Sequence, residues 1–523
     1  MVSSRALLLS ALLATSASAQ TPAPEFTADR FRSHVEFLAS DLMEGRDAGT
    51  RGYDLAASYV ASQFLGLGLT PGGTDGGWYQ QVPLVEALRS GATVTIGGKS
   101  FDPAADIAVG ASTAGPVQEL TAPAVFVGHG VDATDYRGLD VRGKYAVVLS
   151  GFPKGTPSEV GAHLNSMKAR LAQDRGALGV ITVRTLAEQK RRGFDYYLKS
   201  ATQPSIGWVE TDGATFALAP RIRVGATAGG AVAEALFAGA KRSLADVLAE
   251  ADAQGGRPKG FALKPVVSIT RQSNQRRFTS PNVLGVIPGS DPALKDEYVL
   301  LMAHLDHEGT DPKLPGDDKI YNGAMDNATG IATMLEVARA FATGGVRPKR
   351  PILLAAVTAE EDGLLGAEYL AKHKLPAGGK VVGVVNLDMP VLLYDFNDVI
   401  AFGANHSTLG PTVKAAAAQA GVALAEDPLP QEGLFTRSDH YKFVREGVPS
   451  VFLMTGFGNG GEKQFTGFLS THYHKVSDDL KLPINWQAGA KFARINYLIA
   501  KEIADAPQAP KWNADSFFNP GRK

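Results

Sequence analysis

The carboxyl-terminal half of the chain alternates continuous apolar runs with amphipathic ones, and this alternation limits the possible folds more than any other feature. Residues 298–303, 352–357 and 381–385 are apolar throughout, which is typical of strands buried on both faces of a sheet. Residues 331–341 carry apolar side chains at helical spacing instead. We therefore expect residues 281 to about 501 to form an α/β unit with a mixed, largely parallel sheet flanked by helices.

Each of the three apolar runs is followed by acidic or imidazole side chains. His304 and Asp306 follow the first run, Glu360 and Glu361 the second, and Asp388 the third. Ligands of open α/β sheets bind at the carboxyl ends of the strands, and adjacent acids repel one another unless a cation lies close. The pattern favours a metal site at this edge, with a solvated acidic loop as the alternative.

Two further segments carry candidate ligands. Asp326 directly precedes the helical run, so it is either a metal ligand or a carboxylate that caps the helix. Residues 473–479 contain Tyr473, His474 and Asp478. Imidazoles and carboxylates together form a ligand set that zinc accepts.

In their order and form, these motifs resemble the M28 family of co-catalytic zinc peptidases. Residues 38–41 and 44–46 also resemble the start of that family. The resemblance implies the α/β fold of zinc peptidases, which is phosphorylase/hydrolase-like. The motifs of the carboxyl-terminal half that carry it are residues 303–306, 323–327, 360–361, 386–388, 437–440, 447–449 and 473–474.

The middle of the chain predicts an inserted domain. Residues 124–127 and 145–149 are short strand-like runs, and residues 128–131 and 139–144 resemble a protease-associated domain. We expect this insert to be mainly β. The expected divisions are a signal peptide at 1–19, peptidase segments at 20–100 and 266–510, the insert at 101–265, and a tail at 511–523.

The resemblance also implies a role for each candidate residue. It implies two Zn²⁺ per chain, with Asp326 bridging both and no need for further ligands such as His307. The expected ligands are His304 and Asp388 for one ion, and Glu361 and His474 for the other. The remaining roles are Glu360 as general base, Asp306 and Asp478 as residues that orient the ligand imidazoles, Tyr473 as a donor to the oxyanion, and Arg437 as a contact to the substrate.

The implied activity is a secreted or periplasmic metallopeptidase, in which a water between the metals attacks the peptide bond and Glu360 takes its proton. Release of amino-terminal residues is the expected reaction. The same site would also suit a carboxypeptidase or dipeptidase, which needs a cationic pocket for the substrate carboxylate. A glutaminyl cyclase fits less well, because a complete bridging set indicates two metals. A non-catalytic binding protein is disfavoured, because it would not need an intact Glu360. Phe457 and Phe465 either line the substrate cleft or serve in packing.

Composition and the amino terminus restrict partners and compartment. The 52 basic and 53 acidic residues give a net charge of −1, so we expect neither nucleic acid nor an anionic membrane as a partner. The chain has no cysteine, which excludes thiolate zinc ligands and cysteine nucleophiles. Arg5, the apolar residues 6–14 and the small residues 17–19 predict a signal peptide cleaved after Ala19. The sequence does not indicate an oligomeric state.

Overall fold

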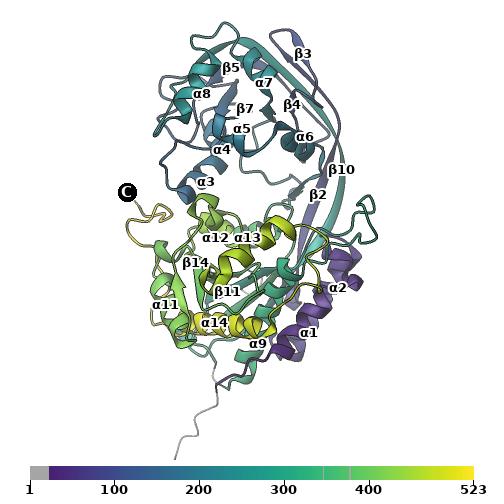
Figure 1. The fold of residues 1–523 in the computed structure, drawn as a ribbon, viewed down its shortest axis with the longest axis vertical. Helices are drawn as coiled ribbons and strands as arrows, with labels where there is room; N and C mark the ends of the chain where they lie inside the picture. The colour runs from purple at the N-terminus through teal and green to yellow at the C-terminus, as the bar shows by residue number, and fades with distance from the viewer. Residues whose placement is uncertain (1–22, 346, 376–377, 523) are drawn as a thin grey trace, which may run out of the picture.

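The computed structural model describes residues 23–345, 347–375 and 378–522; the expected signal peptide lies outside them. Figure 1 shows two parts, a peptidase-like part with the chain's later helices and a second part with β3 to β9. Two long strands, β2 (Tyr79–Ile96) and β10 (Phe261–Ile287), run antiparallel to each other and extend into both. The two parts therefore share one extended sheet.

The peptidase-like part is built on the parallel strands expected from the apolar runs. β11 (Glu297–His304) pairs in parallel with β12 (Ile352–Val357) on one side and with β13 (Lys380–Leu387) on the other. β10 borders β12 in antiparallel register. The other edge continues through β16 (Ser450–Thr455), β14 (Asp398–Phe402) and β15 (Ala423–Ala425).

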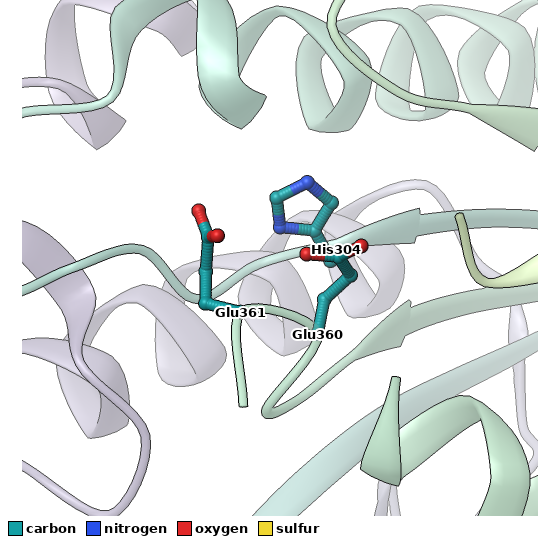
Figure 2. A group of neighbouring side chains, drawn as sticks. All are labelled: His304, Glu360 and Glu361. Atoms are coloured by element: carbon teal, nitrogen blue, oxygen red, sulfur yellow. The ribbon is translucent and has the colours of Figure 1, made fainter. Parts of the chain in front are cut away.

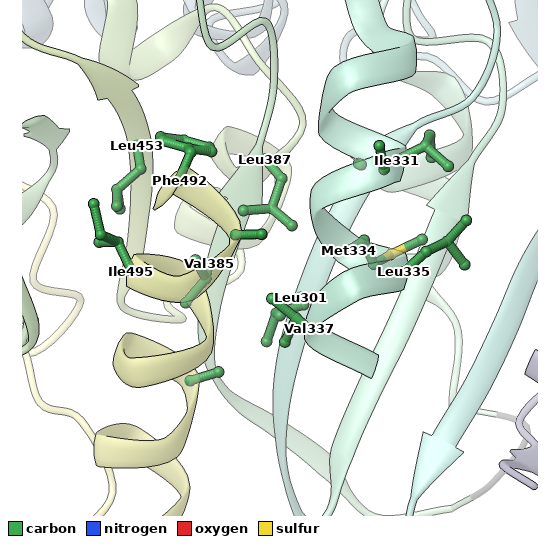
Figure 3. Close-up of a cluster of buried hydrophobic side chains, with 14 of the residues drawn as sticks. Leu301, Ile331, Met334, Leu335, Val337, Val385, Leu387, Leu453, Phe492 and Ile495 are labelled. Atoms are coloured by element: carbon green, nitrogen blue, oxygen red, sulfur yellow. The ribbon is translucent and has the colours of Figure 1, made fainter. Parts of the chain in front are cut away.

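Helices cover both faces of this sheet. Alternate residues of β11 are therefore buried in separate cores on opposite sides. Leu301 belongs to a core that includes Val337, and Figure 3 shows these two side chains next to each other. Leu300 packs into a separate core with Leu370 and Phe443. The helices of the first face are α1 (Ala28–Leu38), α2 (Arg51–Gly66), α9 (Thr329–Thr343), α11 (Leu409–Gln419) and α14 (Trp486–Asp505). The helices of the second face are α10 (Leu365–Lys372) and α12 (His440–Arg445).

The inserted segment is mixed α/β rather than mainly β as expected. Its central strands run parallel in the order β5 (Val117–Phe126), β6 (Tyr145–Leu149), β7 (Gly179–Val183) and β9 (Val224–Ala228). Shorter strands are β3 (Lys99–Phe101), β4 (Ile107–Ala108) and β8 (Ser205–Trp208). Its six helices are α3 (Ser158–Ser166), α4 (Lys168–Asp174), α5 (Leu186–Arg191), α6 (Phe194–Thr202), α7 (Gly230–Leu236) and α8 (Leu244–Asp252).

The insert has its own hydrophobic core and also contacts the peptidase-like part. Its core reaches from Val94 of β2 to Ile269 of β10, slightly beyond the expected limits of 101–265. On α3, Glu159 lies 2.7 Å from Nε2 of His406. Trp208 at the end of β8 donates to Glu368 of α10 over 3.2 Å. These contacts hold the insert against two separate segments of the peptidase-like part, helix α10 and the turn at Ala404–His406.

The last residues of the chain pack against loops of the peptidase-like part. Trp512 donates its indole N–H to the carbonyl of Gly447 over 2.7 Å, and the buried ring of Phe518 contacts that of Phe435 with centroids 5.1 Å apart. The expected tail at 511–523 is thus part of the folded unit up to residue 522. Residues 461–471 form one further helix, α13 (Gly461–Thr471).

Candidate metal centre

Three neighbouring strands deliver candidate ligands to one edge of the sheet. His304 is the last residue of β11, and Asp388 directly follows β13. Glu360 and Glu361 follow β12 after a short turn at Ala359, whose φ of 52° lies in the left-handed region. Because these strands are parallel, their carboxyl ends lie together, as expected from the sequence.

Asp326 connects two groups of ligands. Its Oδ1 lies 3.1 Å from Nε2 of His304, and its Oδ2 lies 3.3 Å from Nε2 of His474. His304 Nε2 is also 3.2 Å from Asp388 Oδ1, and His474 Nε2 is 3.1 Å from Glu361 Oε2. The structure thus brings all five expected ligands together, with one carboxylate between a His–Asp pair and a His–Glu pair. Two imidazole nitrogens that face only carboxylate oxygens are a donor set suited to zinc.

The structure argues against helix capping as the role of Asp326. Helix α9 begins only at Thr329, and its N-cap residue is Ala328. Asp326 has φ −110° and ψ 91°, which is outside the helical region, and its carboxylate faces the two imidazoles. The sequence placed this residue correctly before a helix but could not show that the backbone turns its side chain away from the helix axis.

Asp478 hydrogen-bonds the segment that carries Asp326 and not, as expected, the imidazole of His474. Its Oδ1 accepts a hydrogen bond from the backbone N–H of Met325 over 2.9 Å, and its Oδ2 accepts one from Asp326 over 3.0 Å. The residue beside His474 is Glu308, whose Oε1 lies 3.1 Å from Nδ1 of that ring. Glu308 was missed, although it lies only four residues after His304 in the same strand-end segment.

Asp306 likewise supports His304 through an atom that the sequence could not specify. The Nδ1 of His304 lies 3.2 Å from the backbone carbonyl oxygen of Asp306, so this carbonyl, not the carboxylate, selects the tautomer with Nε2 free for metal. The carboxylate of Asp306 accepts the backbone N–H of Glu361 over 3.2 Å. Asp306 therefore ties the end of β11 to the loop after β12.

The two adjacent glutamates differ in electrostatic environment. Figure 2 shows both side chains rising from consecutive positions beside His304. Burial, together with the charge of Glu361, raises the pKa of Glu360 well above its usual value, against the opposing effect of His304. Burial and Asp326 also oppose ionisation of Glu361, but hydrogen bonds with His307 and His474 lower its pKa to about 2. The surroundings therefore favour the charged form of Glu361 and the protonated form of Glu360.

Other buried side chains fix this edge without being expected ligands. His307 Nδ1 lies 2.7 Å from Glu361 Oε1, on the oxygen that His474 leaves free. Ser438 donates its hydroxyl to Asp388 Oδ2 over 2.5 Å and accepts the amide of Asn386 over 2.6 Å. Sequence reasoning gave no role to His307 or Ser438; the only signal was that Ser438 lies inside a matching motif and that His307 directly follows one.

Arg46 links the first segment of the chain to the metal edge. Its buried guanidinium donates to the carbonyl of Leu305 over 2.9 Å, and to those of Asn322 over 2.6 Å and Gly323 over 3.0 Å. One side chain thus holds the end of β11 next to the loop that carries Asp326. Its role could not be predicted because these three partners are backbone carbonyls more than 250 residues away.

A pocket of about 280 Å³ opens next to these residues. Glu360, Tyr473 and Arg437 line it, and all three were expected near the substrate. Phe465, for which cleft lining and packing were both open, lines it as well. Arg192 of the inserted segment also lines it and was not expected. The pocket's apolar residues besides Phe465 are Met389, Leu429, Leu434, Phe452, Met454 and Leu469.

The parallel α/β sheet, the two ligand groups and the adjoining pocket together define a metal-binding domain of hydrolase type. Residues 282–500 match the family model of peptidase family M28, and this part of the chain is an M28 peptidase domain. The family expected from the motifs is thereby confirmed.

Among curated proteins, the chain is 38% identical over 108 residues to a probable zinc metalloprotease from Pyrenophora teres f. teres, covering 20% of this chain and 22% of that protein. It is 27% identical over 406 residues to the probable glutamate carboxypeptidase VP8 from Zea mays, covering 73% of this chain and 49% of that protein. The matched stretches therefore span less than half of either relative.

Among solved structures, the chain resembles an aminopeptidase from Aneurinibacillus sp. strain AM-1. The TM-score is 0.51 at 20% identity, covering 93% of this chain and 95% of that one. This likeness confirms the fold expected from the sequence, a mixed and largely parallel sheet with flanking helices. In residues 23–345, 347–375 and 378–522, no helix combines the length and apolar character needed to cross a bilayer.

Proposed function

We propose that this protein is a two-zinc aminopeptidase that removes amino-terminal residues from peptides. The observation that carries the proposal is the position of Asp326, whose two oxygens lie within 3.1 and 3.3 Å of imidazoles belonging to two different ligand groups. A carboxylate in that position suits a bridge between two metal ions. The family match and the naming of a similar structure as an aminopeptidase support the same reaction.

The proposal assigns the first zinc to His304, Asp388 and Asp326, and the second to His474, Glu361 and Asp326. Each group offers neutral imidazole nitrogen and carboxylate oxygen, the donors that zinc takes in catalytic sites. When bound, two zinc ions lower the pKa of a water molecule between them and polarise the scissile carbonyl.

The remaining chemistry belongs to the protein's own side chains. Glu360 takes the proton from the attacking water on its carboxylate and delivers it to the leaving amine. Burial raises the pKa of Tyr473, so its phenol keeps its proton and donates a hydrogen bond toward the oxygen that gains charge. Asp478 and Ser438 hold Asp326 and Asp388 in place while the carbonyl changes geometry.

A carboxypeptidase or dipeptidase is the second candidate, favoured by one specific observation. Two guanidiniums, those of Arg192 and Arg437, line the pocket, and a cationic pocket is what recognition of a substrate carboxylate needs. We also propose that the insert is of the protease-associated type. A further part of the proposal is that the protein is exported from the cytoplasm and cleaved after Ala19. Sequencing of the mature amino terminus, expected at Gln20, tests export.

The test compares initial rates of the purified zinc-loaded protein on amino-acid amides and on their N-acetylated forms. We expect cleavage of the free-amine substrates only, and a loss of about a hundredfold or more in kcat for Glu360→Gln. Unchanged zinc content in that variant separates its role from that of the ligands. Cleavage of N-acetylated peptides from their carboxyl end would replace the aminopeptidase by the carboxypeptidase.

A further inference from the structure

The substrate pocket has one wall residue that comes from the inserted segment. Arg192 lies between α5 and α6, yet it lines the same pocket of about 280 Å³ as Glu360 and Asp326. A volume of this size lies just below the range of about 300–1,000 Å³ of ordinary small-molecule sites and suits one or two amino-acid residues. The insert therefore contributes directly to the space in which a substrate lies.

Neighbouring side chains hold Arg192 in place. The guanidinium of Arg184 donates a hydrogen bond to the backbone carbonyl of Arg192. Arg184 itself lies over the rings of Phe194 and Tyr197, 5.7 and 5.2 Å from their centroids. The guanidinium of Arg192 lies 4.6 Å from the centroid of Tyr196. The backbone and the side chain of Arg192 are thus both oriented, which lowers the entropic cost of using it for binding.

Arg192 brings to the pocket a charge that forms no ion pair with a carboxylate among the described residues, although it also acts on Glu188 from a longer distance. Among the described residues, no Asp or Glu oxygen lies within salt-bridge distance of its guanidinium. Arg437, the other guanidinium of the pocket, lies 3.8 Å from Glu432 and is partly neutralised by it. Arg191, one residue earlier, pairs with Glu188 over 2.7 Å. An oriented and unpaired guanidinium favours a carboxylate as the group it binds.

We propose that Arg192 is a specificity residue that binds a carboxylate of the substrate, so that the enzyme prefers short peptides. The wall beside the metal ligands is apolar, formed by residues such as Phe452, Met454 and Phe465, and it suits an apolar amino-terminal side chain. A carboxylate at the opposite end of a dipeptide or tripeptide is then the group left for Arg192. This inference rests on the proposed aminopeptidase and names its substrate class.

The experiment measures kcat and KM for three substrates of the zinc-loaded enzyme: Leu-Ala, Leu-Ala amide and Leu-Glu amide. Leu-Ala carries its carboxylate at the terminus, Leu-Glu amide carries it on a side chain, and Leu-Ala amide has none. We expect wild type to favour Leu-Ala over Leu-Ala amide, mainly through KM. Arg192→Gln should reduce that preference by about tenfold or more, the effect of losing one charge-assisted hydrogen bond, and Arg192→Lys should restore part of it. Arg191→Gln is the matched control and should keep the wild-type ratio.

The outcomes separate the inference from the function on which it rests. Dependence on Arg192 for Leu-Ala supports recognition of the terminal carboxylate, and dependence for Leu-Glu amide supports recognition of an acidic side chain. Equal losses for all three substrates in Arg192→Gln, or no preference in wild type, would overturn the inference. Turnover of Leu-Ala amide by wild type upholds the aminopeptidase in either case, and its absence counts against the proposed function itself.

Discussion

The carboxylate of Asp326 owes its position to groups that bind no metal. Two consecutive backbone N–H groups, those of Met325 and Asp326, donate to the buried carboxylate of Asp478. The guanidinium of Arg46 holds the preceding carbonyls of Asn322 and Gly323. Under the proposed ligand assignment, a loop of irregular backbone fixed in this way does not have to be ordered before it binds metal.

Replacement of Asp478 by Asn should therefore weaken zinc binding without removing a ligand. Asn offers only one acceptor oxygen to the two N–H donors, so one donor is left unsatisfied and the loop can shift. We expect a loss of about tenfold or more in zinc affinity, measured by competition with a chromogenic chelator.

Asp479→Asn is the matched control, because the neighbouring carboxylate pairs with Lys481 over 2.7 Å and has no bond to the loop. It should bind zinc like wild type. Equal affinities in the two variants would show that Asp478 is not needed to position the bridge.

The convergence of the proposed ligands was predictable from the sequence, whereas the groups that support them were not. His304, Glu361 and Asp388 follow apolar runs, and parallel strands necessarily bring such positions to one edge. The supports depend on atoms that a motif does not specify, such as the backbone carbonyl of Asp306 on His304. Asp478 was expected beside His474, but the residue found there is Glu308. The prediction failed because residue types do not show which residue of a loop faces a given side chain.

Strands were predicted well where both faces are buried and poorly where one is exposed. β12 coincides with the expected run 352–357, and β11 extends the run 298–303 by one residue at each end. The long strands β2 and β10 were not predicted, since β10 carries the polar stretch 271–277 and exposes many of its side chains. Their pairing is specified by the partner strand and not by the local sequence.

Helix α4 of the insert contains a buried lysine with a measurable consequence for stability. The amine of Lys168 donates to the carbonyls of Leu149, over 2.6 Å, and Gly151. Burial lowers its pKa from 10.5 to about 7. The unfolded chain therefore binds a proton between pH 7 and 10.5 that the folded chain does not.

Stability should accordingly rise with pH over that interval and be lost as the pH falls toward 7. The slope from this group is at most about 1.4 kcal/mol per pH unit. Thermal or urea unfolding from pH 7 to 9.5 should show a steeper increase for wild type than for Lys168→Met, whatever the absolute stability of the variant. Parallel curves would contradict a neutral buried amine.

The two parts of the chain share a sheet, and they also share the substrate pocket. The insert contacts the peptidase-like part through Glu159 and Trp208 and supplies Arg192 to the pocket. The sequence predicted an insert but not its α/β character or the residue that it supplies to the pocket. Both follow from long-range packing, which a local pattern does not report.

The central claim is that one carboxylate unites two zinc sites, and native mass spectrometry of the zinc-loaded protein tests it most directly. Wild type should carry two Zn²⁺ per chain, and Asp326→Asn should lose both together, since each ligand group shares that residue. Glu360→Gln, the matched acid-to-amide control at the same edge, should keep two. A single zinc in wild type, or one firmly retained zinc in Asp326→Asn, would contradict the bridge.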